Sequence, residues 1–75
     1  MHEYDAKKIV ELFIELSLYN DGWATTSILR DRLHLFFKEE KLGGLLFTVL
    51  DEIMDTKKID NPSIHYDEHD DLWII

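Results

Sequence analysis

Residues 41–55, KLGGLLFTVLDEIMD, carry most of their apolar side chains on one face of a helix. At about 100° per residue, the apolar positions recur at i, i+3, i+4 and i+7 twice over. The opposite arc holds Lys41, Gly44, Thr48, Asp51 and Asp55. The stretch therefore predicts a helix over residues 42–56, beginning near its two glycines, whose inner face is formed by Leu42, Leu45, Leu46, Val49, Leu50, Ile53 and Met54.

Residues 5–19 carry a second helical pattern, with Asp5 as the expected N-cap and Asn20–Gly22 as the expected stop. On a helical wheel Ile14 and Leu18 fall beside two glutamates, away from the centre of the apolar face. Either another helix covers these two residues or they belong to a dimer or partner surface. The core face of this helix is predicted to contain Ala6, Ile9, Val10, Leu12, Phe13 and Leu16.

A third helical pattern covers residues 26–37 and follows a short extended stretch at residues 23–24. Either Thr25 or Thr26 can cap this helix, because a threonine hydroxyl accepts a hydrogen bond from an amide of the first turn. The three helices and the C-terminal segment are predicted to share one core, formed by Phe13, Leu16, Leu29, Leu33, Leu46, Val49, Leu50, Ile53 and Trp73.

The last part of the chain changes from helical to extended spacing. Asp60–Pro62 breaks the helical pattern, Ser63–Tyr66 and Leu72–Ile75 read as strands, and the polar Asp67–Asp71 joins them. The sequence thus predicts a β-hairpin over residues 63–75. No repeat or linker interrupts the 75 residues, so residues 1–75 are predicted to form a single α+β domain.

Three helices followed by a hairpin resemble the winged-helix superfamily, and no specific family within it is identified. It is carried by residues 46–75, where Leu46, Leu50, Ile53 and Ile59 stand at the spacing of the apolar residues on that fold's third helix and its exit. Lys57 stands where many winged helices have a glycine. The resemblance implies a small domain with three helices and a C-terminal hairpin wing.

The charge and composition narrow the classes of partner. Sixteen Asp and Glu against eight Lys and Arg give a net charge of -8, which repels nucleic-acid phosphates and anionic lipids. Nucleic acid is therefore disfavoured as a partner, and no membrane contact is expected. The absence of cysteine and of any run of about 18 apolar residues predicts a soluble, cytoplasmic protein.

The resemblance to winged helices implies DNA binding by the third helix and the wing, but both carry acidic residues here. We therefore predict a non-catalytic interaction or regulatory module, an inhibitor or adaptor, that docks on a basic protein surface. One variant is a DNA mimic, an acidic decoy for a nucleic-acid groove. The candidate protein-interaction residues are Phe47, Thr48, Asp51, Asp55, Ile14, Leu18, Asp67, Glu68, Asp70 and Asp71. Packing of Phe47 against the second helix is the alternative for that residue.

Three other functions compete with this prediction. The first is a DNA-binding transcription regulator that acts as a dimer through Lys41, Arg30, Arg32, Lys57 and Lys58. Apart from Lys41, these cations could instead form salt bridges to neighbouring acids. The second is a metal-responsive switch at His65, Asp67 and His69, against which the same residues form a solvated acidic turn. The third is an enzyme, but no nucleophile stands at a recognisable spacing from a base. The sequence thus predicts no catalytic residue, metal site or cofactor, and it allows a homodimer.

Overall fold

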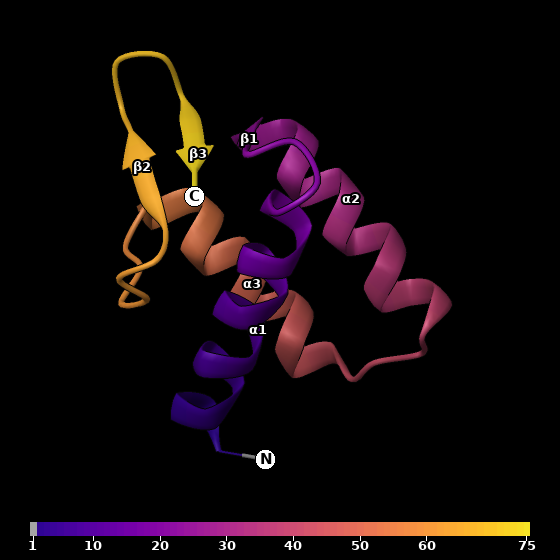
Figure 1. Ribbon diagram of the computed structural model, residues 1–75. Helices are drawn as coiled ribbons and strands as arrows, with labels where there is room; N and C mark the ends of the chain where they lie inside the picture. The colour runs from indigo at the N-terminus through magenta and orange to yellow at the C-terminus, as the bar shows by residue number, and fades with distance from the viewer. Residues whose placement is uncertain (1) are drawn as a thin grey trace.

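The computed structural model describes residues 2–75, so Met1 of the predicted 1–75 domain lies outside the described residues. Its elements follow the order α, β, α, α, β, β (Figure 1). This is a small, winged-helix-like α+β domain, as the sequence predicts. The elements are α1 (Glu3–Leu18), β1 (Trp23–Thr25), α2 (Thr26–Glu39), α3 (Gly44–Thr56), β2 (His65–Asp67) and β3 (Leu72–Ile74).

Helix α1 buries a different arc from the one that the sequence suggested. Its N-cap is His2, so Asp5 lies within the first turn and the predicted cap is wrong. Ile14 is fully buried, as is Leu18, whereas Leu16 is 53 % exposed. The predicted core position of Leu16 and the partner-surface reading of Ile14 and Leu18 are therefore wrong, while the alternative that other elements cover these two is confirmed.

The reason for the error is the width of the apolar arc on α1. Its apolar residues span about 240° of the helix circumference, so the wheel alone cannot select the buried part. In the structure α1 packs against α3 and α2 through the row Ala6, Val10, Ile14 and Leu18. This row is centred about 100° away from the predicted face. Leu12 is exposed, and Phe13 and Ile9 lie half-buried at the edge of the core.

Helices α2 and α3 follow the predicted pattern closely. Thr25 is the N-cap of α2, and its hydroxyl accepts a hydrogen bond from the amide of Ile28 at 3.3 Å. Helix α3 begins at Gly44 with Gly43 as its N-cap, as expected from the two glycines. Its predicted inner face is buried from Leu46 onward, in Leu46, Val49, Leu50, Ile53 and Met54, whereas Leu45 is partly exposed and Leu42 precedes the helix.

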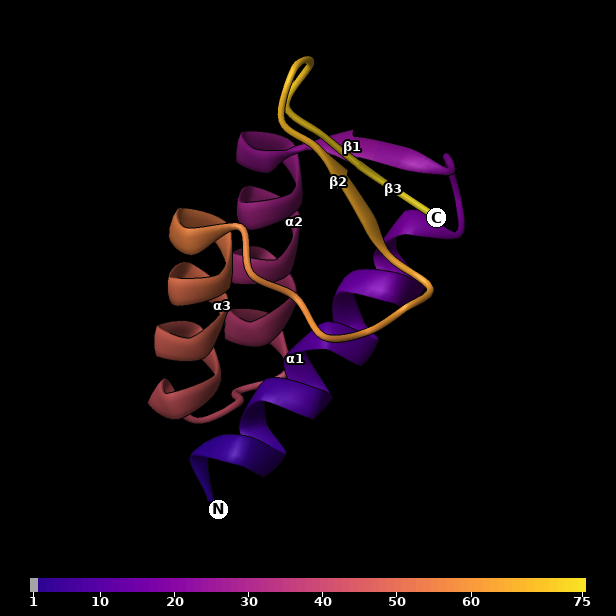
Figure 2. The ribbon, with the colours of Figure 1, turned by 90° about the vertical axis from the view of Figure 1, so that its left-hand side faces the viewer.

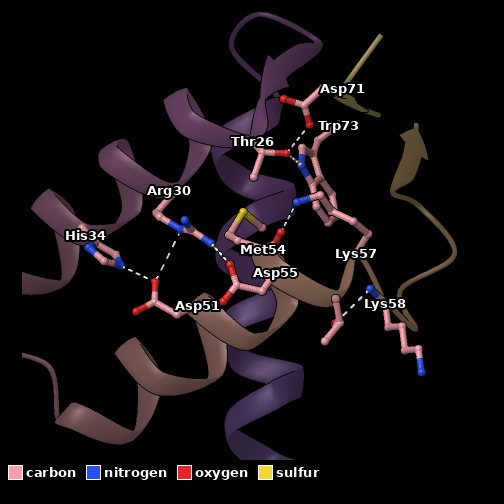
Figure 3. A network of polar contacts seen from close by, with 11 residues as sticks. Thr26, Arg30, His34, Asp51, Met54, Asp55, Lys57, Lys58, Asp71 and Trp73 are labelled. Atoms are coloured by element: carbon pink, nitrogen blue, oxygen red, sulfur yellow. Dashed lines mark hydrogen bonds and ion pairs between the residues drawn. The ribbon is translucent and has the colours of Figure 1, made fainter. Parts of the chain in front are cut away.

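Lys57 ends α3 in the left-handed conformation, with φ of 61°. This is the backbone geometry that a glycine adopts at no steric cost, and a lysine adopts it here. The Lys57 ammonium group donates a hydrogen bond to the carbonyl of Met54, which satisfies one of the last carbonyls of the helix (Figure 3).

The predicted hairpin is confirmed and forms part of a three-stranded antiparallel sheet. The strand order is β1-β3-β2, with Trp73 opposite both Ala24 and Tyr66. The short extended stretch after α1 is thus an edge strand, and β3 is the central one. Trp73 is fully buried and joins the sheet to the helical core.

The hairpin tip and the N-terminus lie far apart in the molecule. In Figures 1 and 2 the hairpin tip lies at the opposite end from the N-terminus, and α2 runs away from the tip. None of the helices within residues 2–75 is long and apolar enough to cross a lipid bilayer.

Candidate functional site

The carboxylates on the outward arc of α3 face Arg30 and His34 of α2. Arg30 Nη2 lies 2.5 Å from Asp55 Oδ1, and Arg30 Nε lies 3.6 Å from Asp51 Oδ1. His34 Nε2 lies 2.7 Å from the same oxygen of Asp51 (Figure 3). Two of the predicted interaction residues, Asp51 and Asp55, are therefore engaged within the domain, where they hold α2 and α3 together.

Other candidate residues on α3 also make internal contacts. The Thr48 hydroxyl donates to the carbonyl of Gly44 at 3.1 Å, a bond within the helix. Phe47 is half-buried, with its ring centroid 5.5 Å from that of Phe37 and 5.4 Å from that of His34. The predicted alternative, that Phe47 packs against the second helix, is confirmed.

Two of the four cations expected in salt bridges are paired as the sequence suggested. Arg30 contacts the α3 carboxylates, and Arg32 Nη2 lies 3.5 Å from Asp21 Oδ2. Lys57 differs, because its ammonium group meets a carbonyl and lies 5.7 Å from the centroid of the Tyr66 ring. The salt-bridge prediction is therefore confirmed for the two arginines and wrong for Lys57. Among residues 2–75 it is also wrong for Lys58, which has no carboxylate within ion-pair distance.

Asp71 is not a free carboxylate of the wing tip. Its Oδ1 accepts hydrogen bonds from the Thr26 hydroxyl and, at 2.8 Å, from the Tyr66 hydroxyl. The Thr26 oxygen in turn accepts a buried hydrogen bond from Trp73 Nε1 at 2.9 Å (Figure 3). These four residues form the Thr26 network, which fastens the wing to the first turn of α2. The prediction of Asp71 as an exposed interaction residue is therefore corrected.

The Thr26 network shifts the pKa values of both acids in it. The hydrogen bond from the Thr26 hydroxyl lowers the pKa of Asp71, and the bond from Tyr66 acts in the same direction. Burial raises the pKa of Tyr66, and its hydrogen bond to Asp71 raises it further. Asp71 also has φ of 53°, a left-handed geometry that aspartate tolerates better than most residues.

The remaining wing carboxylates are available to a partner. Within residues 2–75 no ion pair reaches Asp67, Glu68 or Asp70. Glu68 and Asp70 are exposed at the tip, and Asp67 Oδ1 accepts the amide of His69 at 3.0 Å. An open cleft of about 740 Å³ lies between the end of α3 and β2. This wing cleft is lined by Thr56, Lys57, His65, Tyr66, Asp67 and Glu68.

Glu11 is a buried carboxylate that the sequence did not single out. It is only 4 % exposed, and its Oε2 accepts the amide of Asp60 at 2.9 Å. Glu15 accepts a hydrogen bond from Asn61 at 2.7 Å. Both glutamates hold the connector between α3 and β2 on α1, which is a structural role. Lys7 supports it from outside, because its ion pair with Asp60 at 2.8 Å raises the pKa of Lys7.

The metal-switch alternative receives no support from the geometry. No three His, Asp or Glu side chains in the described part of the chain gather as a metal site would require. The carboxylate of Asp67 instead closes a turn onto the backbone of His69.

Comparison of this chain with protein-family models, with curated proteins and with solved structures finds no match. A function therefore has to be inferred from the side chains described above. They divide the acidic residues into two groups: Asp51, Asp55 and Asp71 are engaged internally, and Asp67, Glu68 and Asp70 extend the charge of the wing outward.

Proposed function

We propose that this chain is a non-catalytic interaction module on a winged-helix scaffold, which docks its acidic wing on a basic protein surface. The observation that carries the proposal is the division of its charges. Arg30 contacts Asp51 and Asp55 across the α2–α3 interface, whereas the wing carboxylates Glu68 and Asp70 face solvent without a cation.

The same division weakens the alternative of a DNA-binding dimer. Arginine reads guanine and contacts phosphate through the free edge of its guanidinium group. The side chain of Arg30 already faces two carboxylates of its own domain. The wing would approach phosphates with Asp67, Glu68 and Asp70, and like charge opposes that approach.

The wing cleft suits a lysine or arginine side chain of a partner. Asp67 and Glu68 line it on one side, and the C-terminal end of α3 lies on the other. A helix C-terminus carries partial negative charge, which adds to that of the two carboxylates. The Lys57 ammonium group opposes this field in part, but it is held against the Met54 carbonyl. Charged groups in this arrangement would mainly raise the association rate with a basic partner.

The test measures binding to an oligo-lysine peptide, which is the basic probe, and separately to random duplex DNA, the ligand of the alternative function. Both measurements use about 150 mM salt. Backbone resonances of the labelled full chain should shift with the peptide around the wing cleft. A variant with Glu68→Lys and Asp70→Lys should bind the peptide more slowly, most clearly at low salt. Asp71 is left unchanged because its substitution would release the wing from α2.

The matched control is the double variant Asp31→Lys and Glu40→Lys, which changes the net charge equally but lies on and after α2. If both double variants lose affinity equally, net charge alone governs binding and the wing has no special role. Submicromolar binding of the wild-type chain to random duplex DNA would overturn the proposal and favour the regulator alternative. Phe47→Ala is a poor probe of the interface, because its ring also packs against Phe37.

A further inference from the structure

The outer faces of α1 and α2 together expose several large apolar side chains. A groove of about 340 Å³ runs between the two helices, with Phe13, Leu16, Leu33 and Phe36 along it. Leu12 of α1 flanks the groove on one side and is 52 % exposed. Leu35 of α2 lies on the other side and is 57 % exposed. We call this area the α1–α2 face.

Leu12, Leu16 and Leu35 are not explained by the proposed docking of the wing. In Figures 1 and 2 α2 runs away from the hairpin tip, so its C-terminal half is the part of α2 that is farther from the tip. A protein that binds the wing would therefore leave this face uncovered. Exposed apolar patches of this kind on a small soluble domain mark interaction sites.

We infer that a second copy of this chain covers the α1–α2 face, in a two-fold symmetric dimer. The argument is the charge pattern on α2. Arg32, Leu35, Phe36 and Glu39 fall within an arc of about 100° on the helix surface. The midpoint of Arg32 and Glu39 lies between Leu35 and Phe36.

This pattern is complementary to itself. When two α2 helices lie antiparallel about a two-fold axis at that midpoint, Arg32 of each copy faces Glu39 of the other. Leu35 of each copy then lies beside Leu35 of the other on one side of this charged row, and Phe36 beside Phe36 on the opposite side. A two-fold interface requires one surface patch that satisfies such reciprocal contacts. A partner of different sequence would not need the oppositely charged residues to be placed symmetrically around the apolar pair.

The electrostatics of this face are compatible with self-association. The chain carries a net charge of -8, so two copies repel each other in most orientations. Around the apolar pair, however, one arginine and one glutamate balance each other. The contact of Arg32 with Asp21 and Ser17 is loose, at 3.4 to 3.5 Å, so Arg32 can turn toward a second copy.

The α1–α2 face is large enough for a stable dimer. At 1.5 Å per residue, α1 and α2 are about 24 and 21 Å long, and packed helices stand roughly 8 to 10 Å apart. A stable dimer buries about 800 Å² on each partner, which is roughly one sixth of the 4880 Å² surface of this domain. Two adjacent helices of these lengths present an area of that order.

The experiment measures the mass of the full-length chain by sedimentation equilibrium, from micromolar to submillimolar concentration. The wild type should form dimers, and Leu35→Asp should raise the dimer dissociation constant by at least about tenfold. Leu45→Asp on α3 is the matched control, because it adds the same charge at a partly exposed leucine outside the face. Circular dichroism verifies that both variants remain folded.

A charge exchange tests the register. Arg32→Glu alone and Glu39→Arg alone should each weaken the dimer, because each places like charges opposite one another. The double variant Arg32→Glu with Glu39→Arg should restore dimerisation, which no asymmetric partner would explain. A wild-type chain that stays monomeric overturns the inference. So does a dimer that Leu35→Asp leaves intact, and failure of the exchange to restore binding excludes the antiparallel α2 contact. Neither result bears on binding by the wing, which is measured separately.

Discussion

Removal of the Thr26 hydroxyl should loosen the joint between the wing and the helices. Thr26 is buried at the start of α2, where its oxygen accepts the indole N–H of Trp73 and its proton goes to Asp71. Valine has nearly the same shape as threonine but can neither donate nor accept a hydrogen bond. Thr26→Val therefore keeps the packing and removes the centre of the Thr26 network.

The expected loss can be worked out from the buried indole. Trp73 is fully buried, so its N–H group cannot turn to water when Thr26 loses its oxygen. A buried donor without a partner costs about 1 to 3 kcal/mol of stability. In a domain of this size each kcal/mol lowers Tm by about 4 to 8 °C. The lost bond to Asp71 acts in the same direction.

The matched control is Thr26→Ser, which keeps the hydroxyl and removes one methyl group, at a cost of about 0.8 kcal/mol. Thermal unfolding followed by far-UV circular dichroism gives the stability of the three proteins. The Nε1–H resonance of Trp73 reports the local change, because it should move and exchange faster only in Thr26→Val. Equal stability of the two variants, with an unchanged Trp73 resonance, would refute the role assigned to the Thr26 hydroxyl.

Two further predictions concern pH and the core. The folded state lowers the pKa of Asp71 below its ordinary value of 3.8, so its stabilisation is present above that pH and is lost as pH falls through the folded pKa. The Tm difference between the wild type and Asp71→Asn should therefore shrink as the pH is lowered from about 7 to about 3. A Tm difference that does not change over this range would contradict the coupling of the Asp71 pKa to folding. Leu50→Ala should cost about 2 to 5 kcal/mol, a large share of the stability of a small domain, because Leu50 is fully buried in α3. Leu45→Ala on the same helix is the control, and urea unfolding with equal midpoints would show that the α3 stripe is not the core.

The apolar spacing and the breaking residues were sufficient to place the secondary structure. Thr25, Gly43 and Pro62 act through short-range backbone effects, so their consequences can be predicted without knowledge of the fold. The inner face of α3 was equally clear, because its apolar residues cover a narrow arc. Leu33, Leu50 and Trp73 are buried as expected for the same reason: each is apolar and stands at a central position of its pattern.

The candidate site was predicted less well than the fold. Glu68 and Asp70 are exposed as expected, since a hairpin tip has few neighbours. Asp71 is one residue further along the chain, but its carboxylate is hydrogen-bonded within the domain. The sequence pattern did not indicate this bond, because its partner Thr26 is 45 residues away in sequence. Asp51 and Asp55 likewise meet Arg30 only when α2 lies beside α3.

The sequence by itself determined where helices and strands form, since capping, glycine and apolar period act over a few neighbouring residues. Only the tertiary structure decided which arc of α1 is buried, so that Ile14 is hidden and Leu16 is open. Both residues lie on one broad apolar arc, and their burial depends on where α2 and α3 pack. The same packing decided which charges are neutralised within the domain and which remain on the wing, because ion pairs between helices depend on distances that no local pattern contains.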